Sequence, residues 1–318
     1  MDYGFAWFTR GPLANSDSLR QIATTGESLG YSHIVVPDHV VIPVTIDSTY
    51  PYSADGSFPG TANGECMDTL VALSFIAAMT SRLRLLTSVM VVPHRPALLT
   101  AKMVATIDRL SGGRMTLGCG AGWMEEEFEA LELPPYAERG AVTDEYIEVF
   151  RKVWSAPTVS HAGKYVNFRN VSVLPNPVQK PGVPIWTGGE SAPALRRAVR
   201  VGDGWYPIGN NPRFPMDTHA RIAGRLDRLK GIADEEGRDL ATLDLAYWSH
   251  WYNPGEEVRN KDGDRMILTG SADTIANDIG EMKRQGFGNL MLNFTTGSAG
   301  ETTDRMAAFM ADVAPRVT

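Results

Sequence analysis

The sequence predicts one (β/α)8 barrel domain over residues 1–318, because helical and strand-like patterns alternate along the chain. The strand-like runs are continuously apolar, which is typical of parallel strands that are covered on both faces. A length of 318 residues suits one barrel with insertions better than two ordinary domains. A doubly wound open sheet is the alternative, and the lack of a dinucleotide fingerprint disfavours it.

Eight strands are expected in this barrel. Five of them end a repeated pattern of amphipathic helical ending, glycine or polar break, and short β-rich run: "ESLGYSHIVV", "MTSRLRLLTSVMVV", "DRLSGGRMTLGCG", "RAVRVGDGWYPI" and "MKRQGFGNLMLNF". Three further runs bring the count to the number that closes such a barrel, namely Tyr3–Trp7, Ile185–Thr187 and Leu243–Tyr247.

Two long insertions interrupt the pattern. The first, residues 40–67, follows the second strand and is rich in Pro, Gly, Ser and Asp. Its Tyr50, Tyr52 and Phe58 offer apolar faces to a ligand, so we expect a lid; a solvated surface loop is the alternative. The second, residues 155–184, contains "VLPNPVQKPGVPIW", whose prolines exclude a helix and predict an extended strap into the fifth strand.

The composition favours a small-molecule partner. Apolar residues make up 43% and charged residues 21%, and the net charge of −7 disfavours nucleic acid or an anionic membrane. The first residues lack a basic segment followed by an apolar stretch, and no run approaches the ~20 apolar residues of a membrane span. Cys66 and Cys119 form no paired motif. These features predict a cytoplasmic protein with inert thiols.

The segment "LGCGAGWMEEEF", residues 117–128, raises the possibility of a phosphate cradle. Its glycines stand at 118, 120 and 122, whereas the dinucleotide fingerprint requires a glycine where Trp123 stands. Three glutamates at 125–127 would also repel a phosphate from the start of the following helix. We therefore expect a tight turn here and a phosphate site elsewhere.

The segment Gly188–Ser191 after the fifth strand is the better phosphate candidate. Its two glycines allow the backbone to approach a ligand closely, and Glu190, in the same loop, is expected among the cofactor-binding residues. We expect Ser191 to cap a helix beginning at Pro193, so that free N–H groups point at an anion. Arg196 and Arg197 would keep the local potential positive. An ordinary capped junction is the alternative.

Strand ends also carry acid–base candidates. Asp38 and His39 follow "HIVVP", and His94 follows the third strand. Histidine is the side chain best suited to exchange protons near neutral pH, so His39 is the candidate acid or base. Asp38 beside it is the second candidate catalytic residue, and it could orient a ring nitrogen of a ligand or accept its N–H. A helix cap or a satisfied polar contact is the alternative for each.

Several other chemistries lack their residues. The six histidines include no H-x-H or H-E-x-x-H motif, so no metal site is expected. The lysines lie away from the predicted strand ends, which disfavours a Schiff-base enzyme, and no G-x-S-x-G motif is present. A barrel that binds a phosphate-bearing cofactor remains, with the cofactor supplying the chemistry.

From Tyr3 to about Val313 the chain resembles the luciferase-like (β/α)8 oxidoreductases, particularly the branch that uses the deazaflavin coenzyme F420. The resemblance rests on "GYSHIVVPDH", "YPYSADG", the long stretch from "TSRLRLLTSVMVVPHRP" to "RMTLGCGAGWMEEEFEAL", "AERGAVTDEYIEVFRKVW" and "NPVQKPGVPIWTGGESAPALRRAVRVGDGW".

The resemblance implies roles for matching positions. Ser88–Val89 matches a bulge with a non-prolyl cis peptide that supports the back of the ring. Asp38 and His39 match positions beside the ring, and the loop with Gly188, Gly189 and Ser191 matches the cofactor phosphate site.

One departure concerns the substrate. Relatives that oxidise sugar phosphates carry a catalytic glutamate where this chain has Trp123, so a sugar phosphate is disfavoured. The expected substrate pocket comprises Trp123, His94, Tyr52 and, as a substitute acid, Glu126.

These observations predict an oxidoreductase that transfers a hydride between coenzyme F420 and a small organic substrate, with a homodimer expected from the resemblance. An FMN-dependent monooxygenase that uses reduced flavin and oxygen is the nearest alternative. A non-catalytic cofactor-binding barrel is the third.

Overall fold

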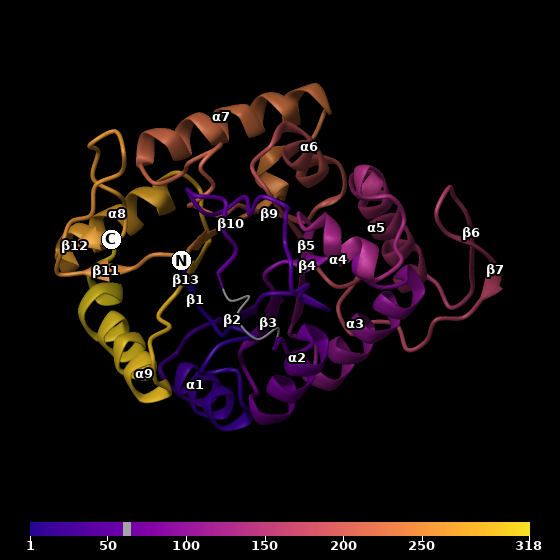
Figure 1. The fold of residues 1–318 in the computed structure, drawn as a ribbon, viewed down its shortest axis with the longest axis horizontal. Helices are drawn as coiled ribbons and strands as arrows, with labels where there is room; N and C mark the ends of the chain where they lie inside the picture. Colours follow the sequence, from indigo (N-terminus) through magenta and orange to yellow (C-terminus); the bar gives the residue numbers. More distant parts are fainter. Residues whose placement is uncertain (60–64) are drawn as a thin grey trace.

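The computed structural model describes residues 1–59 and 65–318, and within them parallel strands form a closed barrel (Figure 1). Each barrel strand pairs with the next along the chain, and β1 pairs with β13 to complete the circle. The predicted (β/α)8 barrel is therefore confirmed. The eight strands are β1 (Asp2–Ala6), β2 (His33–Val36), β3 (Arg84–Thr87), β5 (Met115–Gly120), β8 (Ile185–Gly188), β9 (Gly204–Tyr206), β10 (Asp244–Ser249) and β13 (Asn289–Leu292).

Helices surround the barrel, as Figure 1 shows. Several begin at a polar cap; Asn15, for example, accepts the N–H of Ser18, which satisfies a donor that the first helical turn leaves free. In the part of the chain that the structure describes, no helix has the length and apolarity needed to cross a membrane. The helices are α1 (Ser16–Ser28), α2 (Thr69–Met79), α3 (Ala97–Ser111), α4 (Glu125–Ala130), α5 (Arg139–Ser155), α6 (Ala192–Val201), α7 (His219–Glu235), α8 (Ala272–Arg284) and α9 (Ala299–Ala308).

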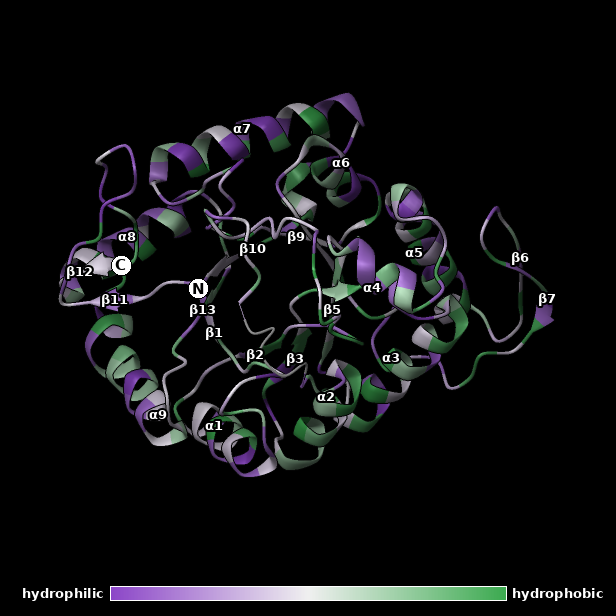
Figure 2. Cartoon of the chain, in the orientation of Figure 1, coloured by the Kyte–Doolittle hydropathy of each residue, from purple (hydrophilic) through white to green (hydrophobic). Residues whose placement is uncertain are grey.

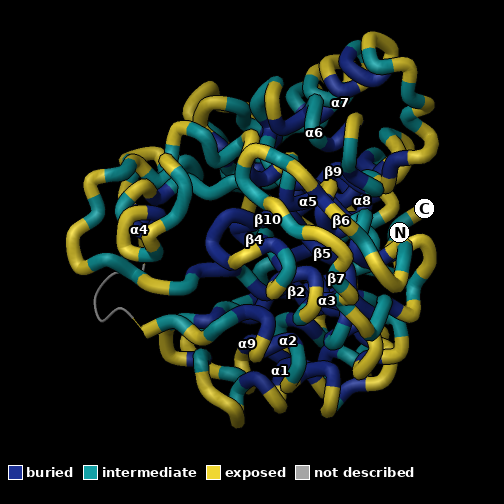
Figure 3. The backbone as a smooth tube through the Cα atoms, turned by 90° about the vertical axis from the view of Figure 1, so that its right-hand side faces the viewer, coloured by how far each residue is buried: buried dark blue, intermediate teal, exposed yellow. Residues whose placement is uncertain are grey.

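The core has two parts because each strand buries both faces. The larger lies between the strands and the helices, and the barrel strands appear dark blue at the centre of Figure 3. The smaller fills the barrel interior with Trp186, Tyr206, Trp248 and Met291 among others. Helix α2 is hydrophobic along most of its length, whereas α7 alternates hydrophilic and hydrophobic residues (Figure 2). The packed interior leaves ligand space at the ends of the strands.

The first insertion lies over the barrel mouth, and its residues 40–59 form neither helix nor strand. Glu126 accepts the backbone N–H groups of Asp47 at 2.7 Å and Ser48 at 2.8 Å. On another side, the Asn210 amide donates to the Tyr52 carbonyl at 2.8 Å. These contacts tie the insertion to the loops after β5 and β9. The described part of this segment therefore lies over the barrel mouth, where a lid was expected.

The second insertion differs from the prediction. Instead of an extended strap throughout, it begins with an antiparallel hairpin of β6 (Val159–Ala162) and β7 (Asn167–Val171) beside α5. Glu145 of α5 accepts the N–H groups of Lys164, Tyr165 and Val166, which fixes the hairpin turn. The proline-rich remainder, residues 172–184, forms neither helix nor strand and contains bends. A further small ladder, unpredicted, joins β11 (Asn253–Pro254) to β12 (Thr269–Gly270).

A buried histidine in the barrel wall predicts how stability depends on pH. Burial, together with the charge of Arg84, lowers the pKa of His33 to about 3, while an unfolded histidine titrates near 6.5. Between these values the unfolded state binds the proton, so the free energy of unfolding falls as pH falls below 6.5. We expect a loss of about 2 kcal/mol from this group between pH 7 and pH 5. Urea unfolding of wild type and His33→Leu at both pH values measures it; equal losses in the two proteins would contradict the assignment.

Candidate active site

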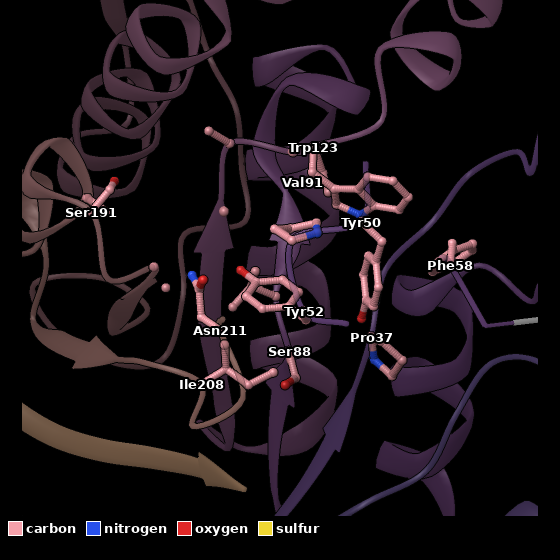
Figure 4. A pocket seen from close by; sticks show the side chains of 18 of the residues that line it. Pro37, Tyr50, Tyr52, Phe58, Ser88, Val91, Trp123, Ser191, Ile208 and Asn211 are labelled. Carbon is pink, nitrogen blue, oxygen red and sulfur yellow. The ribbon is translucent and has the colours of Figure 1, made fainter. Parts of the chain in front are cut away.

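A cavity of about 980 Å³ opens at the carboxyl ends of the barrel strands, beneath the first insertion (Figure 4). Tyr50, Phe58 and Trp123 lie on one side of it, and Ser191 lies on the other. Its size is that of a site for a cofactor together with a small substrate. The position agrees with the rule that barrel enzymes build their sites from the loops that follow the strands.

The floor of the cavity is formed by Ser88 and Val89, whose peptide bond is cis as predicted. The Val89 side chain lies between two glycines of neighbouring strands. A Cβ atom added to Gly120 would come within 2.6 Å of Val89, and one added to Gly188 within 3.2 Å. The Ser88 hydroxyl is 3.0 Å from the hydroxyl of Tyr206, which fixes its orientation. The absence of side chains at both glycines therefore leaves the space that the Val89 side chain occupies.

His39 lies at the cavity wall and pairs with a carboxylate that the sequence analysis did not assign to the site. Its Nδ1 is 2.7 Å from Oε2 of Glu127, and Oε1 of Glu127 accepts the backbone N–H groups of Val40 and Val41. Burial would raise the pKa of Glu127, but the hydrogen bond and charge of His39, the charge of His94 and the Val40 N–H together lower it. Because an ionised carboxylate only accepts hydrogen bonds, Nδ1 of His39 carries the proton and Nε2 is left for the cavity.

The role of Glu127 was missed because the three consecutive glutamates of α4 looked equivalent in sequence. Their fates differ in three dimensions: Glu125 is exposed, Glu126 holds the first insertion, and Glu127 is fully buried against His39. Only the position of α4 relative to the end of β2 distinguishes Glu127 from its neighbours. That position is known only once the fold is known.

The structure shows how the side chain of Asp38, predicted beside the ring, is held; its role toward a cofactor stays a prediction. Its side chain is fully enclosed, and its two oxygens accept from Arg95, each at 2.9 Å. The N–H of Val91 also donates to it, at 3.1 Å. Burial alone would raise the pKa of Asp38, but the charge and hydrogen bonds of Arg95 lower it. Asp38 therefore holds the third-strand loop against the second strand, and it also lines the cavity.

His94 and Glu126, predicted in the substrate pocket, do not line the cavity. His94 lies behind Glu127, with its Nδ1 3.5 Å from Oε1, and burial lowers its pKa despite the nearby carboxylates. Glu126 instead binds the backbone of the first insertion. A strand-end position in the sequence does not fix the direction of the side chain, and both side chains point away from the cavity.

The predicted phosphate loop does line the cavity through Gly188, Gly189 and Ser191. Gly189 has a positive φ of 100°, and an added Cβ would lie 2.9 Å from Ala194, so only glycine fits here. Two details differ from expectation. Helix α6 begins at Ala192, one residue earlier than predicted, and the Ser191 side chain makes no cap hydrogen bond.

Glu190, predicted to contact the cofactor, does not line the cavity. Its carboxylate accepts from the Ile208 N–H and the Asn211 amide, and burial raises its pKa. Of the two expected arginines, Arg197 lines the cavity while Arg196 pairs with glutamates of the α7 end. Arg139 and Arg213, which were not predicted, also line the cavity. Of these three cavity-lining arginines, Arg197 is paired with Asp144.

One wall of the cavity is aromatic, and two predicted pocket residues, Trp123 and Tyr52, each contact Tyr50 there. Trp123 packs on Tyr50 at 5.0 Å and on Phe58 at 5.2 Å between ring centroids, and its ring is 6.3 Å from that of His39. Tyr52 also lines the cavity and meets Tyr50 edge to face. Such contacts between aromatic edges and faces hold the first insertion over the barrel mouth.

A closed parallel barrel with a cofactor-sized cavity at the carboxyl ends of its strands is the architecture of (β/α)8 enzymes. The sequence profile of the luciferase-like monooxygenases matches residues 3–250. The chain belongs to this family, as its motifs predicted.

Individual relatives show the range of the family. An uncharacterized protein of Mycobacterium tuberculosis is 34% identical over 209 residues, covering 66% of this chain and 70% of that protein. The FMNH2-dependent dimethylsulfone monooxygenase of Pseudomonas putida is 33% identical over 138 residues, covering 43% and 38%. The coenzyme F420 dependent tetrahydromethanopterin reductase of Methanopyrus kandleri shares the fold, with a TM-score of 0.76 and 16% identity over 100% of this chain and 99% of that one.

Proposed function

We propose that this protein is an oxidoreductase that transfers a hydride between coenzyme F420 and a small organic substrate. The observation that carries the proposal is the placement of His39, with Nδ1 bound to Glu127 and Nε2 left for the cavity, on the wall of a cavity floored by Ser88 and Val89. Hydride transfer to or from a carbon–oxygen bond requires a proton donor or acceptor at the oxygen, and His39 lines the cavity where it could serve this role.

The residues present fit a planar ring with a phosphate tail. Val89, between Gly120 and Gly188, would support one face of the ring. The aromatic wall would enclose the end of the ring that lies away from the phosphate. The loop of Gly189 and Ser191 would hold the phosphate through backbone N–H groups and the free Ser191 hydroxyl. A bound deazaflavin supplies a carbon that accepts or releases the hydride.

The protein's own groups would then manage the proton and exclude water. Nε2 of His39 takes the proton from a substrate hydroxyl during oxidation, or returns it to a carbonyl oxygen during reduction. The negative charge of Glu127 holds the imidazole in the required orientation. Asp38 would act as a positioning residue, because its pair with Arg95 and its bond to the Val91 N–H hold the loop that carries Val91.

The charge at the phosphate end favours coenzyme F420 over FMN. Coenzyme F420 carries carboxylates beyond its phosphate, whereas FMN ends there. Arg213 lines the cavity, is exposed, and makes no side-chain hydrogen bond or ion pair within the described residues. It is therefore available to a carboxylate beyond the phosphate.

A second candidate is an FMN-dependent monooxygenase, which the 33% identity to the Pseudomonas putida enzyme favours. Reduced FMN reacts with oxygen, whereas a reduced deazaflavin reacts poorly with it. In either case we propose a small-molecule substrate. The cytoplasmic location and the homodimer stay predictions.

Titration of the purified protein with oxidised and reduced coenzyme F420 and with FMN, followed by ring absorbance, tests the proposal. We expect saturable binding of coenzyme F420 and no oxygen consumption during turnover. Arg213→Gln should weaken coenzyme F420 by about tenfold and FMN by less, since one charged contact contributes about 1.5–3 kcal/mol. Saturable binding of FMN alone would reverse the choice of cofactor.

A further inference from the structure

A second cavity of about 350 Å³ adjoins the first on the side of β1 and β13. The two share Ala6, Phe8, Arg10, Tyr50 and His250 in their linings, so they meet at these residues. The remaining walls of the second cavity are mostly apolar, with Trp7, Leu13 and Ile22 among them. A ligand in the main cavity can therefore extend an apolar part into this side chamber.

Among the residues that the structure describes, Arg10 has no counter-charge at the junction of the two cavities. Its guanidinium lies 4.4 Å from the centre of the Phe58 ring, and it makes no hydrogen bond or ion pair within residues 1–59 and 65–318. None of the described residues that line the side chamber is acidic. In the main cavity, the Asp38 carboxylate is already bound by Arg95, and Asp55 accepts from Ser57. The five N–H donors of Arg10 are thus available to an incoming acceptor.

The surroundings of Arg10 make this unpaired charge costly without a ligand. Burial lowers the pKa of Arg10, and burial together with the Arg10 charge lowers the pKa of His250 to about 4. His250 is therefore neutral near pH 7. The junction consequently has a net positive potential, which an anion would relieve.

The cofactor's own phosphate does not account for Arg10. Ser191, at the proposed phosphate end, and Phe58, which Arg10 covers, lie on opposite sides of the cavity (Figure 4). Ser88, at the proposed ring floor, lines the same cavity and lies between Ser191 and Phe58 in Figure 4. An anion at Arg10 is thus on the side of the cavity away from the cofactor phosphate, where the substrate would bind.

We propose that Arg10 selects the substrate: a small organic anion, with a carboxylate or sulfonate held by the guanidinium and an apolar body in the side chamber. This inference rests on the proposed function, because it places the substrate beside the same ring. The planar fork of arginine donates two parallel hydrogen bonds to such an oxyanion, which an amide or alcohol cannot match.

The test uses the full chain without cofactor and three probes of similar size: butyrate, 1-butanesulfonate and butyramide. Tryptophan fluorescence reports binding, because Trp7 lines the side chamber and Trp123 the main cavity. We expect saturable binding of one or both anions, each at least about tenfold tighter than butyramide, and a loss of that preference in Arg10→Gln. Tighter butyrate indicates a carboxylate substrate, and tighter butanesulfonate a sulfonate. Arg10→Lys should retain part of the preference, since it keeps the charge without the fork.

Arg213→Gln is the matched control, because it removes another arginine of the main cavity that does not line the side chamber. It should leave the affinity for the anionic probes unchanged. The inference is wrong if wild type binds butyramide as tightly as the anions, or if Arg213→Gln rather than Arg10→Gln abolishes anion binding. Thermal unfolding verifies that each variant folds, and the comparison of probes on wild type needs no variant. Failure of cofactor binding with anion preference intact would instead refute the proposed function alone.

Discussion

Replacing His39 by alanine should lower turnover by about 10²- to 10⁴-fold, the usual contribution of a positioned acid–base group. The affinity for the ring cofactor should change by less than about threefold, because the floor and the phosphate loop that would hold it contain no His39 atoms. Cofactor titration and steady-state turnover with the same preparation separate the two effects. A variant that loses both in equal measure would demote His39 to a binding residue.

Two glutamate variants sharpen that result. Glu127→Gln keeps the shape at His39 but removes the buried charge, so turnover should fall and its dependence on pH should shift. Glu126→Gln, one residue earlier on α4, changes only the contact with Asp47 and Ser48 and serves as its control. If the two variants have the same pH profile, Glu127 does not act through His39.

Removing the Arg95 side chain, as in Arg95→Met, should lower the free energy of unfolding by about 3–5 kcal/mol at pH 7. The reason is that the fully enclosed Asp38 carboxylate would lose the partner that binds both of its oxygens. Arg95 also contacts Asp68, which is half-buried and loses less. Urea unfolding measures the difference.

The pH dependence identifies the cause of that loss. In wild type the pKa of Asp38 is lowered, so its contribution is present above the unfolded pKa of about 3.9 and is lost as pH falls through the lower folded value. Without Arg95, burial would raise the folded pKa, so the penalty should shrink as pH falls. The double variant Arg95→Met with Asp38→Asn should be more stable than Arg95→Met alone. A single-variant loss below about 1 kcal/mol would contradict a buried charge pair.

The strand pattern predicted the fold well because parallel barrel strands bury both faces, which leaves a continuous apolar run that sequence reveals directly. The hairpin β6–β7 escaped prediction since its strands are largely exposed and its turn depends on Glu145 of α5. No local pattern encodes such a contact.

Backbone features of the candidate site were predictable from the sequence, whereas the contacts of its side chains were less so. Gly189 and the Ser88–Val89 bond follow from local sequence and from the resemblance. Glu127 meets His39 from 88 positions away along the chain, so neither residue identifies the other. The partners of the two strand-end carboxylates were also not predictable: Asp38 lines the cavity but pairs with Arg95, and Glu190 accepts the Ile208 N–H away from the cavity lining.

The pairing of β1 with β13 bears on how the protein is made. The ribosome synthesises β1 before the other barrel strands, and it synthesises β13, the second neighbour of β1, after all of them. Until then β1 and the latest strand are open edges that can pair with other chains. The newborn polypeptide is thus most exposed to aggregation just before its last strand inserts.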